Sequence, residues 1–61
     1  MAYLKRVAKR GVMLVQDVPV RARPLYGGCR YIVRNVHTEK LMQEFRRKTD
    51  AIAWAERNRR G

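Results

Sequence analysis

Acidic residues are scarce in this chain: Asp and Glu together number five in 61 residues, against fifteen Lys and Arg. The single cysteine, Cys29, excludes an internal disulfide, which fits a reducing compartment and predicts a cytoplasmic protein. No apolar run approaches the ~20 residues that a membrane span needs, or the shorter core of a secretion signal. We therefore expect neither a membrane partner nor secretion.

Residues suited to catalysis or metal binding are also few. A chain this short rarely builds the cleft that converging catalytic groups require, so we expect no enzyme activity and no catalytic residues. His37 and Cys29 are the only good soft metal ligands, whereas a zinc site needs about four. We expect no metal and no cofactor, and we interpret Cys29 as a small buried hydrophobic residue.

What the chain has in excess is positive charge, a formal +10 at pH 7. A polyanion that meets such a surface gains free energy, mostly through release of its condensed counterions. Eleven of the fifteen cations are Arg. Because guanidinium groups match phosphate oxygens and guanine edges bidentately, this bias favours nucleic acid over a merely solubilising surface.

Length and hydrophobic content predict one small folded domain over 1–61. A chain of this size buries only ~60% of the surface that its unfolded form exposes, so its stability should be marginal. A hydrophobic content of 46% is nevertheless ordinary for a globular protein, and five aromatic residues are enough to anchor one compact core.

The last third predicts a helix over about 50–59. Thr49 suits the N-cap position, and Asp50 suits the positive end of the helix dipole. Ala51, Trp54 and Ala55 fall on one face. An isolated helix of this length is marginal in water, so Trp54 must pack against another element.

Before the helix, the pattern predicts a β-hairpin. Gly27-Gly28 indicates a turn, 29–36 is rich in strand-forming residues, and 41–46 is typical of the returning strand. Burying an unpaired charge costs on the order of several kcal/mol. Arg30 and Arg34 must therefore point out of the core.

Alternation along the strand then assigns its two faces. Tyr31 and Val33 should point inward, and Ile32 should point outward with Arg30 and Arg34. A loop of three or five residues would place Phe45 on the inner face, whereas a four-residue loop would reverse the assignment. We expect Phe45 on the inner face.

The first third is less regular. One strand is expected somewhere within 12–23, pairing with 29–36, and the alternation in 18–23 resembles an edge strand interrupted by proline. The first ten residues could form a basic arm or a short helix. The predicted fold is thus α+β, a three-stranded antiparallel sheet with a C-terminal helix packed on one face.

The segments Y-I-V-R-N-V-H-T-E-K, L-M-Q-E-F and R-R-K-T-D-A-I-A-W-A-E resemble the small N-terminal arm-site DNA-binding domains of tyrosine recombinases, found in phage and transposon integrases. The resemblance covers about half of the chain, with Glu39 where those domains usually have glycine. It implies a stand-alone relative that places its sheet against DNA, from a phage or mobile element, without strand-exchange chemistry. The matching positions are Tyr31, Val33, Thr38, Lys40, Phe45, Lys48, Thr49, Ala51 and Trp54.

The strongest candidate for binding is the outer face of the predicted sheet. Arginines on a sheet face can reach base edges as well as phosphates in the major groove. The alternative is a solvated face in which Glu44 pairs with Arg34. The candidate residues of this face are Arg21, Arg23, Arg30, Arg34 and Arg46.

Two further basic clusters could each bind nucleic acid or simply carry charge in solvent. Arg46, Arg47 and Lys48 precede the predicted helix and could hold a phosphate at its N-terminus, or could form a loop that simply carries charge. Lys5 and Arg6, with Lys9 and Arg10, could track a DNA backbone or belong to a solvated tail.

We therefore expect a small DNA-binding protein acting on duplex DNA, with a regulatory role as one interpretation. An RNA-binding or ribonucleoprotein component is the first alternative. A protein-binding inhibitor or adaptor that acts on an acidic partner is the second. The inward direction expected for Tyr31 disfavours single strands, because sheets that bind single strands stack bases on exposed aromatic residues.

Overall fold

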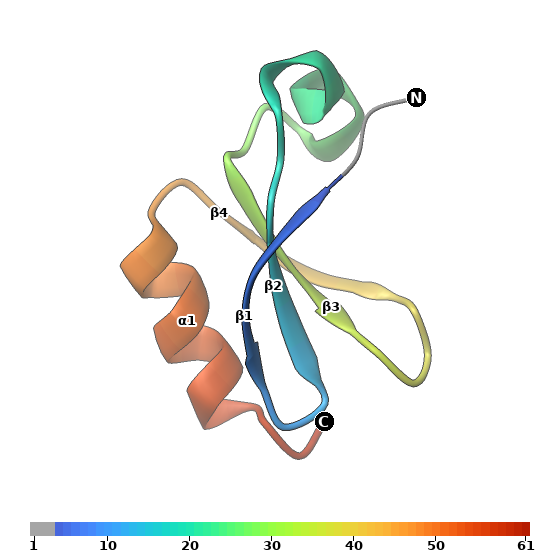
Figure 1. Ribbon diagram of the computed structural model, residues 1–61, viewed down its shortest axis with the longest axis vertical. Coiled ribbons are helices and arrows are strands. Elements are labelled where there is room, and N and C mark those ends of the chain that lie inside the picture. The colour runs from blue at the N-terminus through green and yellow to red at the C-terminus, as the bar shows by residue number, and fades with distance from the viewer. Residues whose placement is uncertain (1–3) are drawn as a thin grey trace.

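The computed structural model describes residues 4–61 and contains an antiparallel sheet, a short 3₁₀ helix and a C-terminal α-helix (Figure 1). The strands are adjacent in chain order, β1-β2-β3-β4, so the sheet is a simple meander. The α+β class and the C-terminal helix are confirmed, but the sheet has four strands rather than three. The elements are β1 (Lys5–Arg10), β2 (Met13–Asp17), η1 (Val20–Tyr26), β3 (Tyr31–Asn35), β4 (Leu41–Phe45) and α1 (Lys48–Arg57).

The extra strand is β1, which replaces the basic arm or short helix expected for the first ten residues. It pairs with β2 through a two-residue hairpin loop, Gly11-Val12, whose glycine has φ 60°. A β-bulge at Val7 explains the error, because both Val7 and Ala8 contact the core cluster under α1. Two adjacent apolar residues on the same side of a strand give a pattern that resembles the spacing of a helix. Met1–Tyr3, the start of the expected arm, lie outside the described residues.

Strand β2 confirms the strand expected within 12–23, and it pairs with β3 as predicted. The alternation in 18–23, however, does not form an edge strand. The last contact of this pairing is the hydrogen bond that the Val18 N–H donates to the carbonyl of Arg30 (2.8 Å). Pro19 follows, with no N–H to continue the ladder and a φ of −65°, and the chain turns into η1.

In the β3–β4 hairpin Tyr31 lies opposite Phe45, as predicted, and residues 36–40 connect the two strands. The register shifts by one residue nearer the loop, where Val33 lies opposite Gln43 but Arg34 lies opposite Leu41. Val33 is fully buried and Tyr31 packs on the same cluster, so the expected inner face is confirmed. The strands are shorter than predicted, ending at Asn35 and Phe45.

Helix α1 begins two residues earlier than predicted, at Lys48, and ends at Arg57. Thr49 is therefore within the first turn and is not the N-cap. The N-cap is Arg47, which makes no side-chain capping bond.

One face of the sheet is covered by α1. Ala51 and Ala55 are fully buried on it, and small side chains at these positions let the helix lie close to the strands. Trp54 is partly buried on the same cluster, with its ring 6.3 Å from that of Phe45. The predicted packing of the helix through its Ala and Trp residues is confirmed.

On the opposite face, within residues 4–61, η1 covers one end of the sheet. Val18, Ala22, Cys29 and Ile32 form a second buried cluster there. Ile32 does point away from α1, but the expectation that it faces outward with the arginines is wrong, because η1 folds over it. Cys29 is buried as predicted.

Candidate nucleic-acid interface

The uncovered part of the sheet surface opposite α1 is called the open face here. Strand register and alternation arrange it in two rows that cross all four strands. The first row is Arg6, Gln16, Ile32 and Glu44, and η1 covers its Ile32. The second row is Lys9, Leu14, Arg34 and Leu41.

The bulge in β1 determines which cations reach the open face. Without it, Arg6 and Lys9 would lie on opposite sides of the strand, because side chains alternate. With the extra residue at Val7, Arg6 lies opposite Gln16 and Lys9 lies opposite Leu14, so both share the open face. Among residues 4–61, neither side chain makes a hydrogen bond or an ion pair, so both are available to a ligand.

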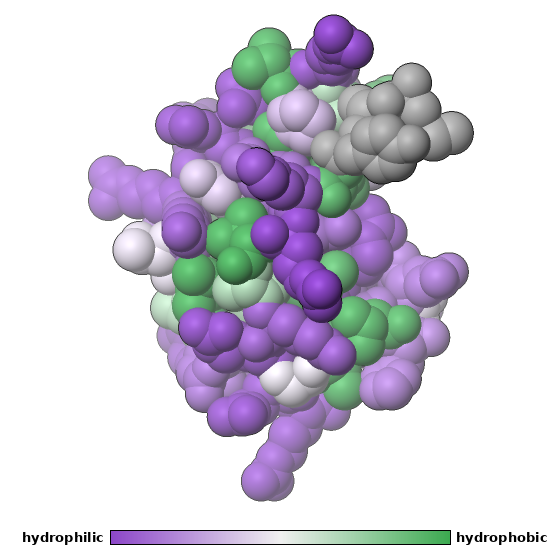
Figure 2. Space-filling view, viewed as in Figure 1, coloured by the Kyte–Doolittle hydropathy of each residue, from purple (hydrophilic) through white to green (hydrophobic). Residues whose placement is uncertain are grey.

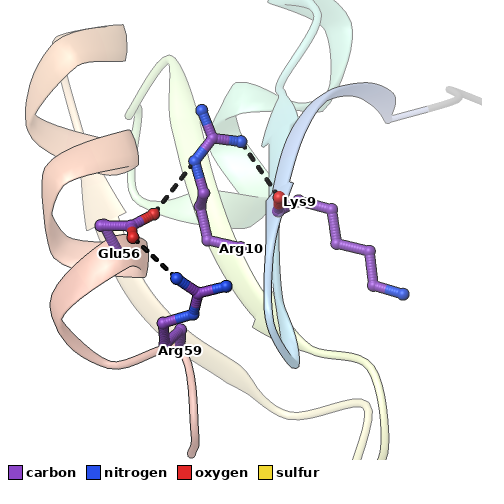
Figure 3. Close-up of polar contacts among 4 residues, drawn as sticks. All are labelled: Lys9, Arg10, Glu56 and Arg59. Carbon is purple, nitrogen blue, oxygen red and sulfur yellow. Dashed lines mark hydrogen bonds and ion pairs between the residues drawn. The ribbon is translucent and has the colours of Figure 1, made fainter.

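Arg10, by contrast, belongs to the α1 side. Its Nε lies 3.2 Å from a carboxylate oxygen of Glu56, and Arg59 contacts the other oxygen at 3.0 Å. Figure 3 shows Arg10 directed toward the helix and Lys9 directed away from it. These partly exposed ion pairs contribute little stability, about 0–1 kcal/mol each, but they fix the direction of Arg10.

Arg34 occupies the centre of the open face and is held in place by two hydrogen bonds. Its Nε donates to Oε1 of Gln16 (3.3 Å) on the neighbouring strand. One terminal nitrogen donates to the carbonyl of Glu39 (2.8 Å) in the hairpin loop. Glu39 has a φ of 62°, the left-handed conformation that favours glycine. Arg34 is half-buried, so these contacts orient a guanidinium group that remains accessible.

The alternative pairing of Arg34 with Glu44 does not occur. Glu44 lies opposite Ile32 on β4, and no ion pair joins it to any cation among residues 4–61. Burial, and then the nearby Glu44 carboxylate, raise the pKa of the Cys29 thiol. The open face therefore runs from cations on β1 to an acidic residue on β4.

The other predicted cations lie around one end of the sheet. Lys5 begins β1 opposite Asp17, the end of β2, and the exposed Arg30 immediately precedes β3. Arg21 and Arg23 lie on η1 rather than on a strand. Arg21 is exposed, whereas the half-buried Arg23 donates from Nε to the carbonyl of Val18 (3.3 Å) and so helps to hold η1.

Arg46, Arg47 and Lys48 lie between β4 and the first turn of α1, and all three are exposed. They lie at the same end of the sheet as Arg30, since Phe45 is opposite Tyr31. The structure therefore divides the predicted set. Arg6 and Arg34 share the open face, while the remaining cations border the end of the sheet near η1 and the β4–α1 loop.

Sequence reasoning missed two members of this surface. Gln16 is not among the predicted binding residues, and Lys9 is predicted only within the N-terminal basic cluster, which could track a DNA backbone or belong to a solvated tail. The alternation of Leu14 and Gln16 with the buried Met13 and Val15 is a signal that could have placed Gln16 outward. Lys9 carries no comparable signal, because the bulge that turns it is not visible in the sequence.

Comparison with protein families, with curated proteins and with solved structures found no match. Figure 2 shows hydrophilic side chains over most of the visible surface, with small separated hydrophobic areas between them. The described part of the chain contains no pocket and no group of three or more potential metal ligands. No helix within 4–61 is long and apolar enough to cross a membrane.

Proposed function

We propose that this protein binds duplex DNA by placing the open face of its sheet in the major groove. The observation that carries the proposal is the gathering of Arg6, Lys9 and Arg34 on one uncovered sheet face. The bulge in β1 and the contacts of Arg34 both serve to display these cations. A solubilising surface requires no such arrangement.

The positions of the aromatic side chains favour a duplex over single strands. Tyr31, Phe45 and Trp54 all pack in the cluster under α1. Tyr26 is half-buried against the second cluster. No strand residue of the open face is aromatic between Lys5 and Phe45, whereas sheets that bind single strands stack bases on aromatic residues of that face.

The dimensions of the sheet suit this mode of binding. Strands are spaced about 4.8 Å apart, and a major groove about 12 Å wide admits two neighbouring strands at once. The cations of the open face lie on β1 and β3, and Glu44 on β4 lies beyond them. We expect β4 to lie farther from the DNA than the other strands, because a carboxylate near phosphates is unfavourable.

The resemblance to arm-site domains of tyrosine recombinases agrees with this proposal, since those domains place a sheet against DNA. It supports a phage or mobile-element origin and a regulatory or targeting role without strand exchange. Arg21, Arg30 and the cluster Arg46 to Lys48 would then contact phosphates beside the groove.

The test compares two double variants that remove the same charge from different surfaces. Arg6→Ala/Lys9→Ala alters the open face, and Arg57→Ala/Arg60→Ala alters exposed positions at the end of α1 and just beyond it. Each lowers the formal charge from +10 to +8 (10 − 2). Binding to a labelled duplex is measured by fluorescence anisotropy over a range of salt concentrations, with folding checked by circular dichroism.

The open-face variant should bind more weakly near physiological ionic strength. Its slope of log K against log salt should fall by about 2, since each lost phosphate contact removes about one unit. The control should keep most of the slope. Equal losses in the two variants would contradict the proposed interface. Stronger binding to single-stranded or hairpin RNA would favour the RNA alternative, and binding only to an acidic protein would favour the adaptor alternative.

A further inference from the structure

The centre of the open face is rich in hydrogen-bond donors. Gln16 and Arg34 are the two polar side chains there, and their mutual hydrogen bond joins the Arg34 Nε–H to Oε1 of Gln16. The carbonyl oxygen of Gln16 is thereby turned sideways, toward β3. Oε1 keeps a second lone pair but is directed toward Arg34, so the group that the amide presents most freely to a ligand is its NH₂, which only donates.

Arg34 is also only a donor. Of its five N–H groups, one is bonded to Gln16 and one to the Glu39 carbonyl, which leaves three. One partner lies on β2 and the other in the hairpin loop, so the group is held from two sides. The guanidinium group is therefore pre-oriented, and less conformational freedom is lost when it binds.

The bases differ in what they present to such a surface. In the major groove guanine shows two adjacent acceptors, N7 and O6, and no donor, whereas adenine shows one acceptor beside an amino donor. A glutamine reads adenine by donating to N7 and accepting from N6 at once. To do so, Gln16 would have to turn Oε1 from Arg34 toward the base and weaken that hydrogen bond.

We infer that the Gln16–Arg34 pair makes this protein select guanine-containing sites in duplex DNA, with Gln16 acting as the residue that positions Arg34. The inference rests on the proposed function and adds the base preference of the site. Arg34 contacts guanine O6 and N7, and the amino group of Gln16 donates to an acceptor on the neighbouring base.

The test uses three duplexes of equal length: one with a G-rich centre, one with an A·T centre, and one in which 7-deazaguanine replaces the central guanines. The last removes the N7 acceptor without disturbing Watson–Crick pairing. Wild-type protein should prefer the G-rich duplex by roughly tenfold to a hundredfold, as one bidentate base contact provides. The 7-deaza duplex should lose most of that preference.

Two variants separate positioning from attraction. Gln16→Met has nearly the same size but no acceptor for Arg34, so it should lower the ratio between the G-rich and A·T duplexes and leave the salt slope unchanged. Lys9→Met should lower the salt slope and leave the ratio unchanged. Thermal melting of both variants by circular dichroism confirms that the fold is retained.

The outcomes are distinguishable from failure of the proposed function. Equal binding to G-rich and A·T duplexes, or a 7-deaza duplex that binds as well as the guanine one, would overturn the guanine preference while DNA binding stands. A Gln16→Met variant with wild-type selectivity would overturn the positioning role of Gln16. Absence of binding to every duplex would overturn the proposed function and the preference with it.

Discussion

The loop Gly11-Val12 offers the sharpest test of the packing, through the substitution Gly11→Ala. Gly11 has a φ of 60°, and a Cβ at this position would overlap the carbonyl oxygen of Arg59 and lie 2.8 Å from its carbonyl carbon. That same carbonyl accepts the Val12 N–H at 2.8 Å. Alanine must therefore push away the segment after α1 and break this bond.

Gly28→Ala is the matched control. Gly28 also has a positive φ, 79°, but a Cβ there would meet nothing within 4 Å. A left-handed alanine costs roughly 1–2 kcal/mol, and reduced freedom of the unfolded chain returns about 0.4–1 kcal/mol. The control should therefore lose about 1 kcal/mol of unfolding free energy.

Gly11→Ala carries the same backbone cost and two more. Loss of the Val12 hydrogen bond removes about 0.5–1.5 kcal/mol, and moving the packed segment adds about 1–3 kcal/mol. A domain of this length has roughly 3–9 kcal/mol in total, so Gly11→Ala should lose a large part of its stability.

Thermal and urea unfolding, followed by circular dichroism, measure the difference between the two variants. At about 4–8 °C per kcal/mol for a domain of this size, Gly11→Ala should melt at least about 6 °C below Gly28→Ala. Melting temperatures that agree within about 2 °C would mean that the contact with Arg59 does not exist in solution.

Three further predictions concern stability and the thiol. Trp54→Ala should cost about 3 kcal/mol, near the lower end for aromatic truncation because the ring is only partly buried; a urea midpoint close to that of the wild type would contradict its packing against Phe45. Glu39→Gly should be neutral or stabilising by up to about 1 kcal/mol, since it relieves a left-handed backbone; a clear fall in melting temperature would refute this. The pKa of the Cys29 thiol is raised in the folded state, so the unfolded thiol ionises first as pH rises. The contribution of this thiol to the free energy of unfolding should be fully present below about pH 8.5 and decline above that pH. If a Cys29→Ala variant shows the same decline, the decline belongs to another group.

The sequence was sufficient to predict the C-terminal half of the fold. Alternation that excludes Arg34 from the core, together with the helical spacing of Ala51 and Trp54, constrains β3, β4 and α1 to one arrangement. Charge and apolar pattern agree at Tyr31, Val33 and Arg34, whereas Ile32 shares the Arg34 face and is buried only because η1 covers it.

The N-terminal half could not be predicted in the same way. The bulge at Val7 breaks the two-residue period on which strand assignment depends, and Pro19 ends an alternation that otherwise suggests a strand. The bulge has no local sequence signal, whereas the effect of Pro19 comes from its missing N–H and fixed φ. Arg34 can be identified as a surface residue from the sequence alone, because its charge excludes it from the core. Placing Lys9 and Gln16 on the open face requires the register of β1 and β2.

The measurement that tests the central claim most directly is a nuclear magnetic resonance titration of the ¹⁵N-labelled protein with duplex DNA near physiological ionic strength. Side-chain signals report on the two faces separately: the Arg34 Nε–H and the Gln16 amide on the open face, the Trp54 indole and the Asn58 amide on the α1 side. Saturable shifts of Arg34 and Gln16 with little change at Trp54 and Asn58 are predicted. Shifts confined to Trp54 and Asn58, with the open face unchanged, would contradict the account.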